Sequence, residues 1–287
     1  MGKNKAPRRG EAHLLISILC VIGTRPEAIK MAPLVRALQR QPERFRVTTL
    51  SSGQHRQMLD QVLQTFGLTT DVDLAVMQEG QTPTAVAARV LAGLEPILAR
   101  QRPDWLLVQG DTTTVLAAAL AAHYQRVRIG HVEAGLRSYD RQNPFPEESN
   151  RVLTDHLSDL CFAPTERARQ NLLREAIPDS RIRVTGNTVV DALLWAIAQP
   201  LTERAAALLG EMGHDGRQHL VLVTAHRRES FGAPLERICH ALKEIARRGQ
   251  GRLHVLYPVH PNPQVRGPVT SLSVSYTHLT LPTIYSV

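Results

Sequence analysis

The sequence of 287 residues lacks long apolar runs and paired cysteines, and each absence excludes a class of protein. No apolar run reaches the ~18 residues that a membrane-spanning helix needs, so we expect no membrane insertion. Cys20, Cys161 and Cys239 are far apart without CxxC spacing, which excludes a disulfide scaffold and a zinc ribbon and fits a reducing cytoplasm. The histidines have neither HxxxH nor HExxH spacing, so we expect no metal site.

The net charge of +8 suggests nucleic acid at first sight, but its distribution argues against that partner. Half of the excess is Lys3, Lys5, Arg8 and Arg9, and the rest is spread along the chain. Only 4% of the residues are aromatic. A nucleic-acid surface needs clustered basic residues with stacking rings, so we expect no nucleic-acid partner.

The composition, 43% apolar and 21% charged, favours a chain that buries a core. Residues 1–12 are polar and basic, and an apolar run follows over 14–22. This order also resembles a secretory signal. However, no small-x-small cleavage site follows, and the run has the length of a buried parallel strand. We therefore expect a disordered leader over 1–12 and a first strand after it.

Apolar runs and helical periodicity alternate after this first strand. Strands are predicted near 45–50, 104–109, 127–132, 159–163 and 181–185, and helices near 27–40, 54–66, 82–100, 112–124, 147–158 and 165–176. Such alternation is typical of an α/β fold with a doubly wound parallel sheet. It predicts a Rossmann-like domain over residues 13–185.

A second unit is predicted over residues 186–268. It begins with a helix through about Ala198 and a polar stretch, followed by a strand at 219–225, a helix near 234–248 and a strand at 253–257. So small a parallel sheet cannot cover both of its faces, which indicates an incomplete Rossmann-like domain. The alternation stops after Pro268. Residues 269–287 are rich in Ser and Thr without Asp, Glu, Lys or Arg, and we interpret them as an artefactual tail rather than a final strand or disordered end.

Polar side chains follow several strands, at the edge where doubly wound sheets bind ligands. Arg25 and Lys30 lie at the helix start after the first strand, a good seat for phosphate, although a simple turn with solvated charges is the alternative. Asp111, Glu133 and Glu147 each follow a strand or open a helix. Each alone is explained as a helix cap or a response to the helix dipole. If the three carboxylates converge on one crevice, they can serve together as general acids and bases.

The second unit offers histidines after its strands. His226 is followed by Arg227 and Arg228, and His260 follows the next strand. A lone histidine is more often structural than catalytic. The neighbouring arginines favour an anionic ligand held between the two domains.

Seven short stretches resemble, in order and spacing, the signature motifs of the non-hydrolysing UDP-N-acetylglucosamine 2-epimerases. They are GTRPEAIK at 23–30, QHRQMLDQ at 54–61, GDTTT at 110–114, HVEAGLR at 131–137, PEE at 146–148, GNT at 186–188 and HRRE at 226–229. The resemblance implies two Rossmann-like domains facing across a cleft, as in GT-B glycosyltransferases. It implies interconversion of UDP-N-acetylglucosamine and UDP-N-acetylmannosamine through UDP elimination and a glycal, with no cofactor.

By this resemblance Asp111, Glu133, Glu147 and His226 are catalytic, while Arg25, Lys30 and Arg227 bind the nucleotide sugar. Gln54, Gln57, Arg227 and His260 resemble an allosteric site found in some bacterial members. The resemblance also implies a homodimer when the protein is full length, and a role in supplying precursors of surface polysaccharides.

The chain departs from the family pattern after Pro268. Family members continue with a Ser-Gly-Gly/Glu-Glu segment that holds uridine and diphosphate, and the chain has no counterpart. We therefore expect this polypeptide to be inactive as it stands. Three alternatives remain open: a GT-B glycosyltransferase, a hydrolysing epimerase and an inactive nucleotide-sugar binding module.

Overall fold

The computed structural model describes residues 15–53, 56–76, 78, 80–226, 230–249, 251–260 and 262–273. These residues form two compact units that divide between Ala198 and Gln199, and each unit is described by itself.

The first unit contains a seven-stranded sheet in which every neighbouring pair of strands is parallel. Its strands are β1 (Ile16–Ile22), β2 (Phe45–Ser51), β3 (Val72–Asp73), β4 (Trp105–Gln109), β5 (Arg128–Val132), β6 (Leu160–Ala163) and β7 (Ile182–Val184). The order across the sheet is β3-β2-β1-β4-β5-β6-β7. The chain therefore winds outward in both directions from the β1–β4 junction, which confirms the predicted doubly wound sheet.

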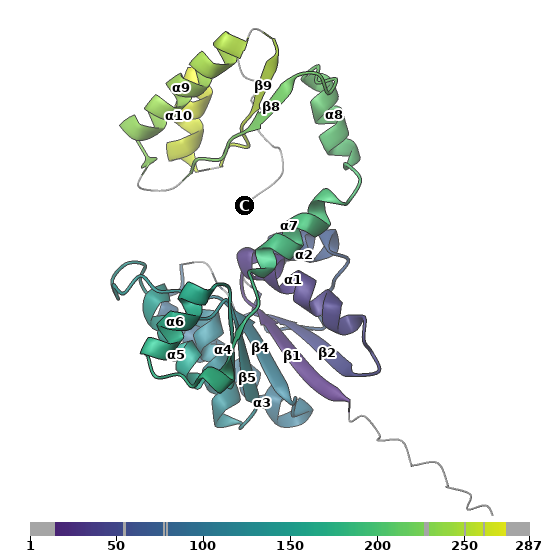
Figure 1. Ribbon diagram of the computed structural model, residues 1–287, viewed down its shortest axis with the longest axis vertical. Coiled ribbons are helices and arrows are strands. Elements are labelled where there is room, and N and C mark those ends of the chain that lie inside the picture. Colours follow the sequence, from purple (N-terminus) through teal and green to yellow (C-terminus); the bar gives the residue numbers. More distant parts are fainter. Residues whose placement is uncertain are drawn as a thin grey trace, which may run out of the picture. The chain divides into compact units, whose positions relative to one another are not determined.

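Helices connect these strands (Figure 1). They are α1 (Arg25–Gln39), α2 (Arg56–Thr65), α3 (Pro83–Gln101), α4 (Thr113–Tyr124), α5 (Glu147–Leu157), α6 (Glu166–Arg174), the short 3₁₀ turn η1 (Asp179–Arg181) and α7 (Thr188–Ile197). The sequence located every strand of this sheet except the two-residue β3. That strand is too short to show an alternating pattern.

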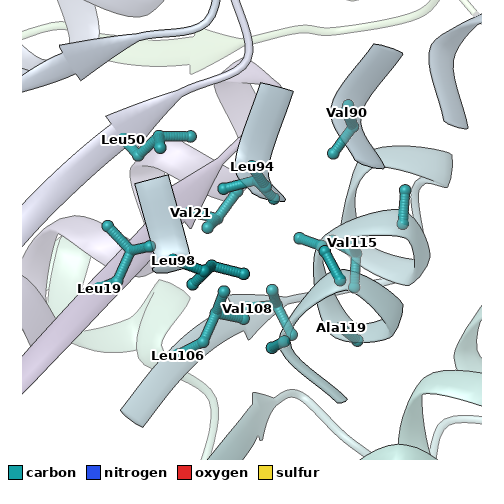
Figure 2. Close-up of a cluster of buried hydrophobic side chains, with 14 of the residues drawn as sticks. Leu19, Val21, Leu50, Val90, Leu94, Leu98, Leu106, Val108, Val115 and Ala119 are labelled. Atoms are coloured by element: carbon teal, nitrogen blue, oxygen red, sulfur yellow. The ribbon is translucent and has the colours of Figure 1, made fainter. Parts of the chain in front are cut away.

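The two faces of the sheet bury different side chains because residues alternate along each strand. Leu19 and Val21 of β1 pack with α3 and α4 on one face (Figure 2), whereas Ile18, Cys20 and Ile22 pack with α1 and α2 on the other. With helices over both faces, the central strand β1 is an almost continuous apolar run.

Helix α7 belongs to the first unit, so the boundary predicted after residue 185 is wrong. Ala192 is buried in the cluster formed by α1 and α2, and the Trp195 ring lies 4.6 Å from the Phe66 ring. The Arg36 guanidinium also lies over Trp195, at 5.2 Å from its ring centroid. These contacts hold α7 against the first unit, whereas sequence reasoning grouped it with the chain that follows.

The second unit has the predicted parallel pair β8 (His219–Leu222) and β9 (Leu253–Leu256). Its helices are α8 (Glu203–Glu211), α9 (Ala233–Gly249) and α10 (Pro263–Ser273). Leu235 and Leu242 of α9 pack with Val255 in its core. Leu220 and Leu222 of β8 are exposed, as expected for so small a sheet.

Two helices of the second unit were not predicted. Helix α8 lies in the stretch that sequence reasoning took as merely polar. Helix α10 continues through Pro268, and Val265 and Val269 on either side of it are fully buried. Residues 269–273 of the predicted tail are therefore the end of a helix that begins before Pro268. The rest of the predicted tail, and the leader over 1–12, lie outside the described residues.

Candidate active site

The candidate site lies at the carboxyl ends of β1, β4 and β5, beside the point where the winding of the sheet reverses. Gln109 at the end of β4 pairs with Val132 at the end of β5, and the Gly110 amide donates to the Val132 carbonyl over 3.1 Å. Asp111 and Glu133 therefore leave adjacent strands at the same edge. This is the crevice in which doubly wound sheets bind ligands.

The turn after β1 is built by a buried carboxylate. Glu27 Oε2 accepts from the Gly23 amide over 2.5 Å, and Glu27 Oε1 accepts from the Thr24 hydroxyl over 3.0 Å. Thr24 is the N-cap of α1 and Glu27 completes a capping box. A Cβ at Gly23 would lie 2.9 Å from the Thr114 Cβ, so glycine is required here for contact with α4.

Burial sets the ionisation of Glu27. It raises the pKa of the carboxyl from 4.5 to about 6, although hydrogen bonds from Gly23, Thr112 and Thr24 oppose the rise. Because the folded protein binds this proton more tightly than the unfolded chain, the stabilisation is present below about pH 4.5 and is lost as the pH rises through about 6.

We expect Glu27→Gln to remove this pH dependence. The rise in the pKa of Glu27 from 4.5 to about 6 corresponds to about 2 kcal/mol. The free energy of unfolding of the wild type should therefore fall by that amount relative to Glu27→Gln between about pH 4 and pH 7. Urea unfolding at several pH values measures this difference. The exposed Glu43→Gln serves as the control and should track the wild type. Parallel curves for Glu27→Gln and wild type would contradict the assignment.

Glu133 is surrounded by hydrogen-bond donors from three elements. The Lys30 ammonium of α1 lies 2.8 Å and 2.6 Å from its two oxygens, and the Asn187 amide donates to it over 2.7 Å. The Gln109 amide also donates to the Glu133 carboxylate. Glu133 has a φ of +70°, in the left-handed region that side chains rarely adopt. Strain of this kind is concentrated at functional sites, where surrounding contacts hold it in place.

Asp111 is not the cap of α4. That role belongs to Thr112, whose hydroxyl accepts from the Val115 amide over 3.3 Å. The Asp111 carboxylate instead accepts from the Arg151 guanidinium of α5, and its side chain is 30% exposed. Asp111 is therefore an accessible carboxylate with a cationic partner at the edge of the sheet.

The two adjacent glutamates at the start of α5 have different environments. Glu148 is buried, accepts from the backbone amides of Ser138 and Tyr139, and lies 3.4 Å from Arg151. Burial opposes its ionisation, but these hydrogen bonds and Arg151 lower its pKa overall. Glu147 is half-buried and has no polar partner among the described residues. Glu148 thus holds the loop that contains Ser138 and Tyr139, and Glu147 is the glutamate left available for a ligand.

The other predicted residues are only partly described. Arg25 is exposed at the first position of α1, without an ionic partner in the described part of the chain. His226 is exposed in the second unit, and its ring stacks on that of His260 with centroids 5.2 Å apart. Gln54, Arg227 and the side chain of Gln57 lie outside the described residues. Convergence of His226 with the carboxylates stays a prediction, because they belong to different units.

A family model described as UDP-N-acetylglucosamine 2-epimerase matches residues 36–284 of the chain. The chain belongs to this family. A curated UDP-N-acetylglucosamine 2-epimerase of Escherichia coli is 53% identical over 260 residues, covering 90% of the chain and 69% of that relative. The family match runs past Pro268, so it gives no support to the expectation that the resemblance ends there.

Solved structures of epimerases have the same fold. A putative UDP-N-acetylglucosamine 2-epimerase from Listeria monocytogenes is 42% identical with a TM-score of 0.81, covering 90% of this chain and 66% of its own. The UDP-GlcNAc 2-epimerase from Neisseria meningitidis, solved with UDP-GlcNAc bound, is 41% identical with a TM-score of 0.80, covering 91% of this chain and 70% of its own. The chain thus spans about two thirds of the length of these epimerases.

Sequence reasoning missed three residues of the candidate site. Gln109 and Asn187 hold Glu133, and Arg151 holds Asp111. Their proximity depends on tertiary contacts. Asn187 is 54 residues from Glu133 along the chain. The sequence offered one signal for these two residues, which is their position. Gln109 is the last residue of a strand, and Asn187 precedes the helix that follows another strand.

Two further findings concern metals and membranes. Among the residues that the structure describes, no group of three or more His, Cys, Asp or Glu side chains is arranged to hold a metal ion. Within the same residues, no helix has both the length and the apolar character needed to cross a membrane.

Proposed function

We propose that the chain contributes the acid/base half of a site for reversible C2 epimerisation of UDP-N-acetylglucosamine to UDP-N-acetylmannosamine. The observation that carries the proposal is the pair of carboxylates at one sheet edge, Glu133 within reach of Lys30 and Asp111 beside Arg151, in a member of this family. The family match favours neither alternative, a GT-B glycosyltransferase or an inactive binding module.

The chemistry requires more than a base. The C2 proton has no neighbouring carbonyl to acidify it, so the anomeric C1–O bond breaks first or in concert with its removal. The electron pair of the C2–H bond forms the C1=C2 double bond of a glycal, the proton passes to a carboxylate, and UDP leaves with the bonding pair of the C1–O bond. UDP then re-adds at C1 while C2 is protonated from the opposite face.

Carboxylates near the sugar serve two purposes in such a path. They stabilise the oxocarbenium-like charge that develops at C1, and they carry the C2 proton. We assign these purposes to Asp111, Glu133 and Glu147, with His226 as the contribution of the second unit. Asp111 and Glu133 follow the carboxyl ends of β4 and β5, and Glu147 lies in the first turn of α5, the helix whose Arg151 bonds Asp111.

Cationic groups are needed for the departing diphosphate. We assign binding of the nucleotide sugar to Arg25, Lys30 and Arg227. Lys30 already pairs with Glu133, so bound diphosphate would compete with that carboxylate for the ammonium. Such competition frees Glu133 for the sugar once substrate is bound.

The assembly and compartment form part of the proposal. We propose a cytoplasmic homodimer when the protein is full length. The three cysteines are buried free thiols, and burial raises the pKa of the Cys20 thiol to about 12, which keeps it unreactive. This supports a reducing compartment, where such thiols stay unpaired.

Solvent exchange at C2 tests the function. The chain, and a chimaera that continues it with the C-terminal third of the Escherichia coli relative, are incubated with UDP-N-acetylglucosamine in D₂O. We expect the chimaera to place deuterium at C2 of both UDP-sugars, and the chain alone to show no turnover. Transfer of the sugar to an acceptor would favour a glycosyltransferase, whereas binding without exchange would favour a binding module. Turnover by the chain alone would contradict the sequence-based expectation that it is inactive.

A further inference from the structure

A fully buried histidine connects the candidate site to the interior of the first unit. His131 lies on β5, two residues before Glu133, and its side chain has no exposed surface. Its Nδ1 lies 2.6 Å from Asp155 Oδ1 of α5, and its Nε2 lies 2.7 Å from the Gly110 carbonyl oxygen. The ring therefore links α5 to the turn that presents Asp111.

The chemistry of the two partners fixes where the protons are. A carbonyl oxygen can only accept, so Nε2 must carry a proton to bond Gly110. Asp155 Oδ2 accepts from the Gly135 amide over 3.1 Å and from the Arg137 guanidinium over 2.7 Å. Burial opposes ionisation of Asp155, but His131 and Arg137 together outweigh it and hold its pKa below the usual range. An ionised carboxylate also only accepts, so Nδ1 carries a proton as well.

The surrounding charges balance such a buried cation. Arg137 bonds Glu175 over 2.7 Å and 2.6 Å in addition to Asp155, so two cations face two carboxylates. Half-exposed His156 lies 4.0 Å from Glu175 at the outer end of this network. The titratable neighbour on β6 is Cys161, which pairs with His131 across the β5–β6 register. Burial raises the pKa of its thiol, which stays neutral. A buried charge is tolerated when it is paired and hydrogen-bonded in this way.

We propose that His131 is a buried imidazolium and a positioning residue, which clamps the Gly110 carbonyl to Asp155 and so holds Asp111 at the site. The proposal deepens the proposed function, because it takes Asp111 as one of the catalytic carboxylates. His131 itself has no exposed atom with which to touch a sugar. Bonds from a charged donor are stronger than neutral ones, which suits a clamp on a turn beside the reacting groups.

Nitrogen NMR of the chain as it exists tests the protonation state. With ¹⁵N-labelled histidine at about pH 7, we expect both ring nitrogens of His131 to carry protons, because each faces an oxygen that only accepts. His131→Gln identifies the signal. In Asp155→Asn the side-chain amide can donate to Nδ1, so we expect a neutral ring that keeps its proton on Nε2. A neutral wild-type ring under the same conditions would overturn the proposal.

Hydrogen exchange in the same chain tests the clamp. The Gly110 amide donates to Val132, and its exchange should rise at least about tenfold in His131→Gln. Exposed His123→Gln is the matched control and should leave this amide unchanged. Unchanged exchange in folded His131→Gln would refute the positioning role. If that variant does not fold, the signal that changes in Asp155→Asn identifies His131, and the wild-type NMR result still decides the protonation state.

Neither measurement uses substrate. A neutral His131 therefore overturns this inference while leaving C2 epimerisation intact. Absence of C2 exchange in the chimaera counts against the proposed function alone.

Discussion

Replacing Glu133 by glutamine is expected to slow C2 exchange by the chimaera by at least about 100-fold, within the range of general acid–base contributions. The amide oxygen of glutamine can still accept from Lys30 and Asn187, so the size and most contacts of the side chain are kept. What is lost is the negative charge and the ability to take a proton. The measurement is the rate at which deuterium from D₂O enters C2.

The matched control for this prediction is Glu95→Gln. Glu95 is exposed on α3 and has no polar partner in the described part of the chain, so its replacement tests only the loss of one carboxylate from the first unit. We expect its exchange rate to stay within about twofold of the parent, since surface substitutions of this kind have small effects. Equal rates for Glu133→Gln and Glu95→Gln would remove Glu133 from the acid/base assignment.

The second large effect is expected from Arg137→Met, which should lower the free energy of unfolding by about 3–5 kcal/mol. Arg137 and Asp155 have fully buried side chains 2.7 Å apart. Methionine fills part of the space but leaves Asp155 with one cation, His131, and Glu175 without its bidentate partner. Breaking one side of a buried ion pair costs more than the pair contributes, because the remaining charge stays out of water.

Urea unfolding of the chain measures this loss, and Arg169→Met is the control. Arg169 also bonds two carboxylates, Glu166 and Asp179, but both are mostly exposed. Exposed pairs contribute about 0–1 kcal/mol, so the control should unfold close to the wild type. Similar losses in the two variants would show that burial of the Arg137–Asp155 pair has no special weight.

Much of the first unit could be predicted from local pattern. Strands β1 and β4 are short apolar runs, and each is followed within a few residues by a helix with a recognisable start. The carboxyl ends of parallel strands meet at one edge, so Asp111 and Glu133 could be placed together before any coordinates existed. The position of these two carboxylates depends only on the direction and order of the strands that precede them.

What could not be predicted depends on packing between distant segments. Nothing in the PEE stretch distinguishes Glu147 from Glu148, because the backbone amide that donates to Glu148 belongs to a loop ten residues earlier. Helix α7 follows a strand like any helix of a second domain, and only its packing, with Ala192 buried and Trp195 against Phe66, assigns it to the first unit. Pro268 is usually a helix breaker, yet α10 continues through it with Val265 and Val269 buried on either side.

The most direct test of the account is a crystal structure of the chimaera with UDP-N-acetylglucosamine bound. The distance to measure runs from the sugar C2 atom to the nearest carboxylate oxygen of Asp111, Glu133 or Glu147. The account predicts a near-attack separation of roughly 3–3.5 Å for at least one of them, with His226 facing the same sugar. A sugar bound with none of these three carboxylates beside C2 would contradict it.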